Sequence, residues 1–342
     1  MPRVTVDQHG SQYYYEDTGA PHQSSDYTTL ILVHGAGFQG AVFEPLFAHA
    51  AARNMRLVAV NMRDYYGSTP YSASELADLG STDVERQAKA IRARGLEILT
   101  FLLWFIRKES IPPLLPATEA EDWAMEGYHY WADELAPNDV EFLAGYMRAL
   151  VLYDPAPRAF GAPMSSLQDS YNPLNDSSLS PEQMKRVFPS WVSGYYTHSK
   201  AMLDALPSLS RDALVAGFSQ DPVVDSPIQH TPTILRMSDG ELARVVNEDA
   251  VAHSHILYEH VDGKVYSDNV RKALCHTSIW PGLRVVLVWF NTIGQPVDDA
   301  SVQFDWKGPI IFHTGISQNA RCNYWPTSYG PENLQEMWRC MH

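Results

Sequence analysis

A histidine-glycine turn is the first place in this sequence where residue types and spacing indicate chemistry. His34, Gly35, Ala36 and Gly37 follow the apolar run 29–33, which has the composition of a short buried strand. Such a turn can direct backbone N–H groups at the negative charge that develops on a carbonyl oxygen during acyl transfer. We therefore expect these four residues to bind substrate, with the amides of Ala36 and Gly37 as the oxyanion hole. The alternative is that they only turn the chain.

No serine stands in a complete G-x-S-x-G motif, the pattern that presents a nucleophile on a sharp turn between a strand and a helix. Two partial matches surround Ser219 and Ser317. Ser219 lies in a segment of Pro-, Ser- and aromatic-rich composition, and Ser317 follows the last expected strand. Neither position suits a nucleophile, so none is assigned.

An acid followed by a histidine, the chain order that an acid-base pair would need here, is found near the end of the sequence. Asp298 and Asp299 follow the apolar run 283–290, and His313 lies within the run 309–313. In a nucleophile, acid, histidine mechanism the acid holds the tautomer of the histidine, which takes and returns the proton. We predict Asp298 or Asp299 with His313 as this pair. The alternatives are a surface loop for the aspartates and a packed strand residue for the histidine.

The elements that must position these residues alternate between strand and helix over the first 110 residues. Alternating segments at 3–7 and 13–15 predict an N-terminal hairpin. The apolar runs 29–33 and 56–61 predict buried strands, and a Ser-Thr-Asp capping signal at 81–83 begins a long helix. This order indicates an α/β protein.

The alternation fails over residues 109–145, which hold prolines and an acidic, aromatic stretch but no β-branched run. Nothing there has the composition of a central parallel strand. Strand signals return at 146–155 and 283–290. A missing strand leaves unpaired backbone groups on both neighbours, at about 1–3 kcal/mol for each buried group, unless the neighbours pair directly. One explanation for the missing strand signal is that the segments 121–131 and 316–321 derive from a shifted exon boundary or from alternative splicing.

Three motifs in this order resemble the α/β-hydrolase superfamily, and more narrowly its fungal branch of ester and epoxide hydrolase-like proteins. They are the segment 13–19, the HGxG turn at 34–37 and the RDxxGxS segment 63–68. The resemblance implies an α/β-hydrolase fold with a mostly parallel central sheet, from which the nucleophile strand is missing, and a helical lid insertion.

The resemblance also implies a division of the chain. Residues 1–155 and 280–342 would form the core, and residues 156–279 the lid. The lid would carry aromatic side chains toward a pocket for a small hydrophobic substrate, although such a cluster is more often ordinary core. The aromatic residues expected to line the pocket are Trp191, Tyr195 and Tyr196.

Two further positions depart from the family pattern. Asn291 stands where the family often has aspartate, and Arg321 where it has the catalytic histidine. Three functions stay open. The first is hydrolysis of an ester, lactone or epoxide in fungal small-molecule (secondary) metabolism. The second is an altered or inactive member that binds or isomerises a hydrophobic metabolite, and the third is a scaffold.

The composition of the chain limits the classes of partner that we expect it to bind. A formal charge of −15 over 342 residues argues against nucleic acid and anionic membranes. Three cysteines without metal spacing favour a reducing compartment, so we expect a cytoplasmic protein. No apolar run reaches 18 residues, and no nucleotide or metal motif is present. We therefore expect no cofactor and no metal, and the oligomeric state stays open.

Overall fold

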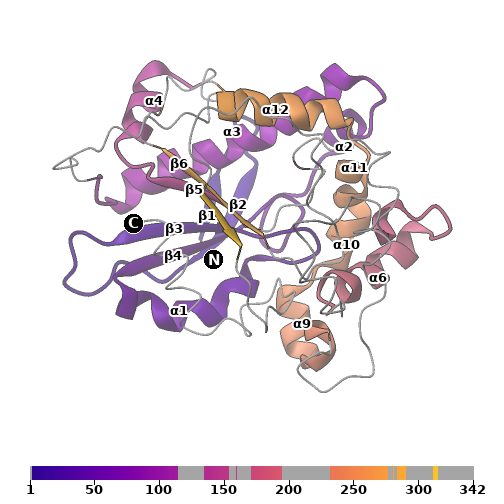
Figure 1. The fold of residues 1–342 in the computed structure, drawn as a ribbon, viewed down its shortest axis with the longest axis horizontal. Helices are drawn as coiled ribbons and strands as arrows, with labels where there is room; N and C mark the ends of the chain where they lie inside the picture. Colours follow the sequence, from indigo (N-terminus) through magenta and orange to yellow (C-terminus); the bar gives the residue numbers. More distant parts are fainter. Residues whose placement is uncertain are drawn as a thin grey trace.

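The computed structural model of this protein describes residues 2–114, 135–153, 159, 171–194, 232–275, 280, 283–289 and 311–314. Within these residues the strands form a four-stranded sheet and a three-stranded sheet, with helices around them (Figure 1). The α/β class that the sequence predicts is therefore confirmed. No described helix is long and apolar enough to cross a membrane.

The first sheet is mixed. Its strands lie in the order β1 (Arg3–Thr5), β2 (Gln12–Asp17), β4 (Met55–Asn61) and β3 (Thr28–Val33). β1 pairs with β2 and β2 with β4 in antiparallel fashion, while β3 pairs with β4 in parallel. The predicted N-terminal hairpin is thus present, and the strand that follows it in space is β4.

Strand β4 is buried at every position because both faces of the first sheet are covered. Successive side chains of a strand point to opposite faces. Val58 and Val60 pack with Phe101 and Phe105 of the long helix α3 (Val84–Glu109). On the other face Leu57 packs with residues of helix α1 (Glu44–Ala50). This two-sided burial holds the central strand in register.

Helix α3 begins and ends near the residues that the sequence indicates. Its N-cap is Asp83, whose side chain accepts hydrogen bonds from the amides of Glu85 and Arg86, so the first free N–H groups of the helix are satisfied. It ends where Ser110 adopts a left-handed conformation, φ 50°. The capping signal therefore predicts the start of this helix correctly.

The second sheet is parallel throughout. It contains β5 (Ala149–Tyr153), β6 (Arg284–Trp289) and β7 (Ile311–Thr314), in that order. Two of these strands come from the C-terminal part of the chain, so β5 pairs with a strand more than a hundred residues away. The described residues thus form one mixed and one parallel sheet in place of a single, mostly parallel one.

The break between the two sheets falls between β3 and β5. Among the described residues, β3 pairs only with β4 and β5 pairs only with β6. Ala149 and Val151 nevertheless pack against the core cluster that contains Leu32 of β3. The described part of 62–148 contains no strand. The edges that would flank a missing central strand therefore lie in one core without pairing with each other.

Helices surround these sheets. In the described ranges the remaining α-helices are α2 (Ala73–Leu79), α4 (Pro137–Ala144), α6 (Pro181–Val192), α9 (Asp239–Val245), α10 (Glu248–Ala250), α11 (Ile256–Glu259) and α12 (Gly263–Cys275). Short 3-10 helices are η1 (Gly40–Phe43), η2 (Ala51–Arg53), η5 (Pro173–Asn175) and η8 (Thr233–Arg236), and Val251–His255 is a π-helix.

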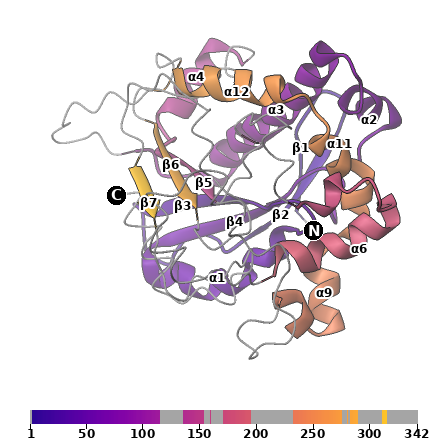
Figure 2. The same ribbon diagram turned by 45° about the vertical axis from the view of Figure 1, so that its right-hand side comes forward.

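Within the predicted lid, residues 156–279, the described parts consist mainly of short helices. Figure 2 shows α6, α9 and α11 gathered on one side of the molecule. A separate lid domain, like the core division at 1–155 and 280–342, stays a prediction.

Candidate active site at the His34–Gly37 turn

His34 is a neutral, buried residue that fixes the turn after β3. Its Nε2 accepts a hydrogen bond from the amide of Met62 at 3.1 Å, so its proton is on Nδ1, which donates to the carbonyl oxygen of Gly35 at 2.9 Å. Burial lowers the pKa of His34 to about 3. With both ring nitrogens engaged, His34 holds the turn together and has no lone pair left for a substrate proton.

Gly37 is required at its position. Its φ is +77°, and a Cβ there would lie 3.1 Å from the ring of Phe188 and 3.3 Å from Val251. Its N–H donates to the hydroxyl of Tyr65 at 2.8 Å, and its carbonyl oxygen accepts from the amide of Asn247 at 2.9 Å. The predicted oxyanion donor Gly37 is therefore already engaged within the protein.

Ala36 carries the other predicted oxyanion donor. The residue is half-buried and packs against the apolar cluster of Phe188 and Val251. Among the described residues, its N–H has no hydrogen-bond acceptor. Of the two predicted donors, the amide of Ala36 is thus the one without an acceptor among the described residues.

Tyr65 joins the turn to the π-helix. Its side chain is buried, with 2 % of the residue exposed, and its hydroxyl lies 2.7 Å from Nε2 of His255. The same hydroxyl accepts from the amide of Gly37, so it is hydrogen-bonded to both the turn and the π-helix. Burial raises the pKa of Tyr65 and lowers the pKa of His255 to about 4. Both groups are therefore neutral at pH 7.

A carboxylate-imidazole pair lies beside Tyr65. Oδ2 of Asp64 is 2.9 Å from Nδ1 of His253, and Oδ1 accepts from the amide of Tyr71 at 2.8 Å. The side chain of Asp64 is 3 % exposed and that of His253 is 46 % exposed. The pair therefore has a buried, oriented acid and an imidazole that reaches solvent.

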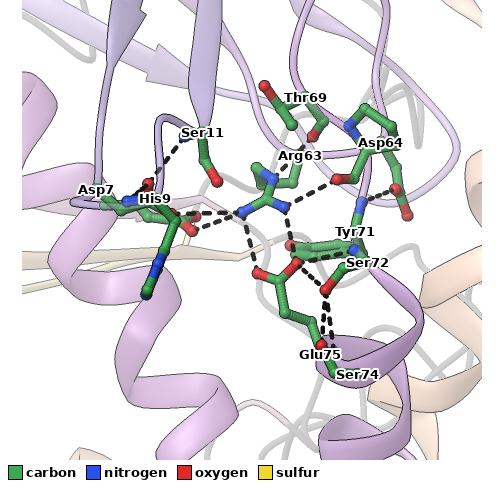
Figure 3. A network of polar contacts seen from close by, with 12 residues as sticks. Asp7, His9, Ser11, Arg63, Asp64, Thr69, Tyr71, Ser72, Ser74 and Glu75 are labelled. Carbon is green, nitrogen blue, oxygen red and sulfur yellow. Dashed lines mark hydrogen bonds and ion pairs between the residues drawn. The ribbon is translucent and has the colours of Figure 1, made fainter.

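The loop that carries Asp64 and Tyr65 is anchored by Arg63 (Figure 3). This buried guanidinium binds the carboxylate of Glu75 at 3.0 Å and that of Glu97 at 3.0 Å, and it donates to the carbonyl oxygen of Thr69 at 2.8 Å. Glu97 also accepts from the hydroxyl of Tyr13 at 2.9 Å. Such bidentate, charge-assisted bonds fix the direction in which the next two residues of the loop point.

The structure describes some of the predicted site residues and not others. His34, Gly35, Ala36 and Gly37 form one turn, and Trp191 packs in the same apolar cluster as Ala36. His313 lies in β7, opposite Val288 of β6. Asp298, Asp299, Tyr195 and Tyr196 lie outside the described residues, so their roles and that of His313 stay predictions.

Sequence reasoning missed the residues that the structure gathers around Gly37. These are Asp64, Tyr65, Asn247, His253 and His255. The RDxxGxS segment was a signal for the first two. Asp64 and His253 are 189 positions apart, and neither stands in a spacing typical of catalysis, so the sequence carries no pattern that pairs them.

The described residues contain no group of three or more His, Cys, Asp or Glu side chains suited to a metal ion. Two groups near the turn are suited to chemistry of their own. The amide of Ala36 can donate to an oxygen atom, and the partly exposed imidazole of His253 can take part in proton transfer.

Comparisons with known proteins give structural likeness only. No family model and no curated protein sequence matches the chain. An esterase from Exiguobacterium antarcticum is similar in structure, with 11 % identity, 99 % of this chain and 98 % of that chain covered, and a TM-score of 0.47. An epoxide hydrolase from an endophytic Streptomyces has 16 % identity, coverage of 99 % and 94 %, and a TM-score of 0.46. An N-acyl homoserine lactonase has 13 % identity, coverage of 99 % and 96 %, and a TM-score of 0.42. Likenesses at this level do not assign an activity to the chain.

Proposed function

We propose that this protein is a hydrolase of the α/β-hydrolase superfamily that cleaves an ester, lactone or epoxide of a small hydrophobic molecule. The observation that carries this proposal is the His34–Gly37 turn. It follows directly on β3, a strand that is paired in parallel, and it leaves the amide of Ala36 without an acceptor among the described residues. In open α/β sheets ligands bind outside the carboxyl ends of the strands, where such turns lie.

The proposal gives each predicted residue a role. The amide of Ala36 would hold the developing oxyanion, a contribution of about 2.7–4 kcal/mol for a single donor in comparable sites. Trp191, with Tyr195 and Tyr196, would bind the apolar part of the substrate. The acid-base pair predicted from chain order is Asp298 or Asp299 with His313.

The setting we propose is fungal secondary metabolism in the cytoplasm, without a cofactor. It rests on the resemblance of the motifs and on the composition of the chain. The partner would be a small hydrophobic substrate, with neither nucleic acid nor a membrane involved.

Hydrolysis is tested by incubating the purified chain with p-nitrophenyl acetate and butyrate, a γ-lactone and an aryl epoxide, and by measuring product formation. We expect turnover of at least one class above the buffer rate. The matched control is the exposed His22→Ala variant, which should keep the wild-type rate. A folded chain that turns over none of these compounds would contradict the proposal.

A second function is favoured by one specific contact. The hydroxyl of Tyr65 occupies the amide of Gly37, one of the two predicted oxyanion donors. An altered family member that binds or isomerises a hydrophobic metabolite would have this feature. It would show a rise in Tm with ligand, as expected for binding to the native state, together with no turnover and no adduct with a fluorophosphonate.

A further inference from the structure

We propose that His253 is the general base of this site and that Asp64 positions it, so that the pair activates water against a carboxylic ester or lactone. This inference rests on the proposed hydrolase function and names a different acid-base pair from the one predicted by chain order. It is carried by contacts that the structure shows.

The geometry of the pair is that of a carboxylate orienting a base. The carboxylate of Asp64 binds Nδ1 of His253 at 2.9 Å, which places the ring proton on Nδ1 and leaves Nε2 as the proton acceptor. The second carboxylate oxygen is held by the amide of Tyr71, so the acid cannot turn away from the imidazole. The exposure of His253, 46 % of its side chain, allows water to approach.

The pair lies beside the turn that would bind the substrate oxygen. Asn247 donates through its amide to the carbonyl oxygen of Gly37 and through Nδ2 to the carbonyl oxygen of Asp64. The hydroxyl of Tyr65, the residue after Asp64, is hydrogen-bonded to Nε2 of His255 and accepts from the amide of Gly37. The loop with the acid, the helix with the base and the turn are thus tied together by direct hydrogen bonds.

Two local conformations that are uncommon in proteins support a functional reading. Asp64 has a φ of +72°, in the left-handed region that non-glycine residues seldom adopt. His253 and His255 both lie on the π-helix Val251–His255, and π-helical turns occur frequently at functional sites. Both conformations are held in place by the contacts described above, as expected where local strain positions a reacting group.

A purely stabilising ion pair explains these features less well. A pair with one half-exposed partner contributes little to stability. Of the charged side chains on the helices packed against the π-helix, Lys185 of α6 binds Asp249 of α10 and Glu182. The carboxylate that contacts the imidazole of His253 is that of Asp64.

The reaction balances without a covalent enzyme intermediate. Nε2 of His253 takes a proton from water as the water oxygen forms a bond to the carbonyl carbon of the ester, whose oxygen is held by the amide of Ala36. The carbon-oxygen bond to the leaving group then breaks with its electron pair, and the imidazolium returns the proton to the leaving alkoxide. The products are a carboxylic acid and an alcohol, and no G-x-S-x-G serine is needed.

The test compares His253→Ala, His313→Ala and His260→Ala with the wild-type chain in ester hydrolysis. His260 is the matched control because it is exposed, lies at the end of the neighbouring helix α11, and bonds to the carbonyl oxygen of Ile256. We expect His253→Ala to lower kcat by about 100-fold or more, the typical effect of losing a general base, with little change in KM and Tm. Added imidazole should restore part of the rate, and Asp64→Asn should lower kcat as well.

The outcomes separate this inference from the hydrolase proposal. No turnover by the wild-type chain would overturn both. Turnover that is unchanged in His253→Ala, or lost only in His313→Ala, would overturn the role of His253 and leave the hydrolase in place. A loss in His253→Ala that follows a fall in Tm and is not restored by imidazole would show a structural role, and it too would overturn the inference.

Discussion

At the scale of single residues, the turn depends on glycine at position 37. Gly37→Ala must adopt a left-handed conformation and place a Cβ 3.1 Å from Phe188. Gly19→Ala is the matched control, because Gly19 has nearly the same φ, +75°, with nothing within 4 Å of the added atom. We expect Gly19→Ala to lower the free energy of unfolding by about 1 kcal/mol, and Gly37→Ala to lower it further. Equal losses in urea denaturation would show that the contact with Phe188 has no effect.

The hydroxyl of Tyr65 is a second single group on which the stability of the turn depends. Tyr65→Phe would leave the buried amide of Gly37 and Nε2 of His255 without their partner. A buried polar group left unpaired costs about 1–3 kcal/mol, so we expect the free energy of unfolding to fall by that order. The neighbouring exposed Tyr66→Phe is the control and should change it by less than about 0.5 kcal/mol. Thermal and urea unfolding measure both, and equal stability of the two variants would contradict the role of this hydroxyl.

At the scale of elements, the break between the sheets predicts a difference between neighbouring strands. β4 is paired on both sides, by β2 and β3, whereas β3 is paired with β4 alone among the described residues. Backbone amides that bond within a sheet are protected from hydrogen exchange. We therefore expect peptides from β4 to exchange more slowly than peptides from β3, as measured by mass spectrometry. Equal protection of the two strands would show that a further segment pairs with β3.

At the scale of the whole molecule, buried histidines make stability depend on pH. Burial lowers the pKa of His34 from 6.5 to about 3 and that of His255 from 6.5 to about 4. Between these values and 6.5 the unfolded chain binds protons that the folded chain does not bind, so stability falls as pH falls. We expect Tm to decrease from pH 7 to pH 4. The Tm of the exposed His22→Ala variant should fall with pH as steeply as that of the wild-type chain, and the Tm of His255→Gln should fall less steeply. A constant Tm over this range would contradict the burial of these rings.

Much of the element pattern follows from local sequence. The hairpin, the strand before His34 and the helix that begins after Asp83 are encoded by alternation, apolar runs and a capping residue, each of which acts within a few positions. The absence of a strand signal over residues 109–145 stays a prediction, since residues 115–134 lie outside the described part of the chain.

Tertiary structure alone brought Asp64 to His253 and Tyr65 to Gly37. The first two residues lie 189 positions apart, and their contact depends on the packing of the π-helix against the loop that Arg63 anchors. It also showed that the predicted donor Gly37 is occupied by Tyr65. Local propensities cannot encode such contacts, because a side chain's partner at long range is set by how all the elements pack together.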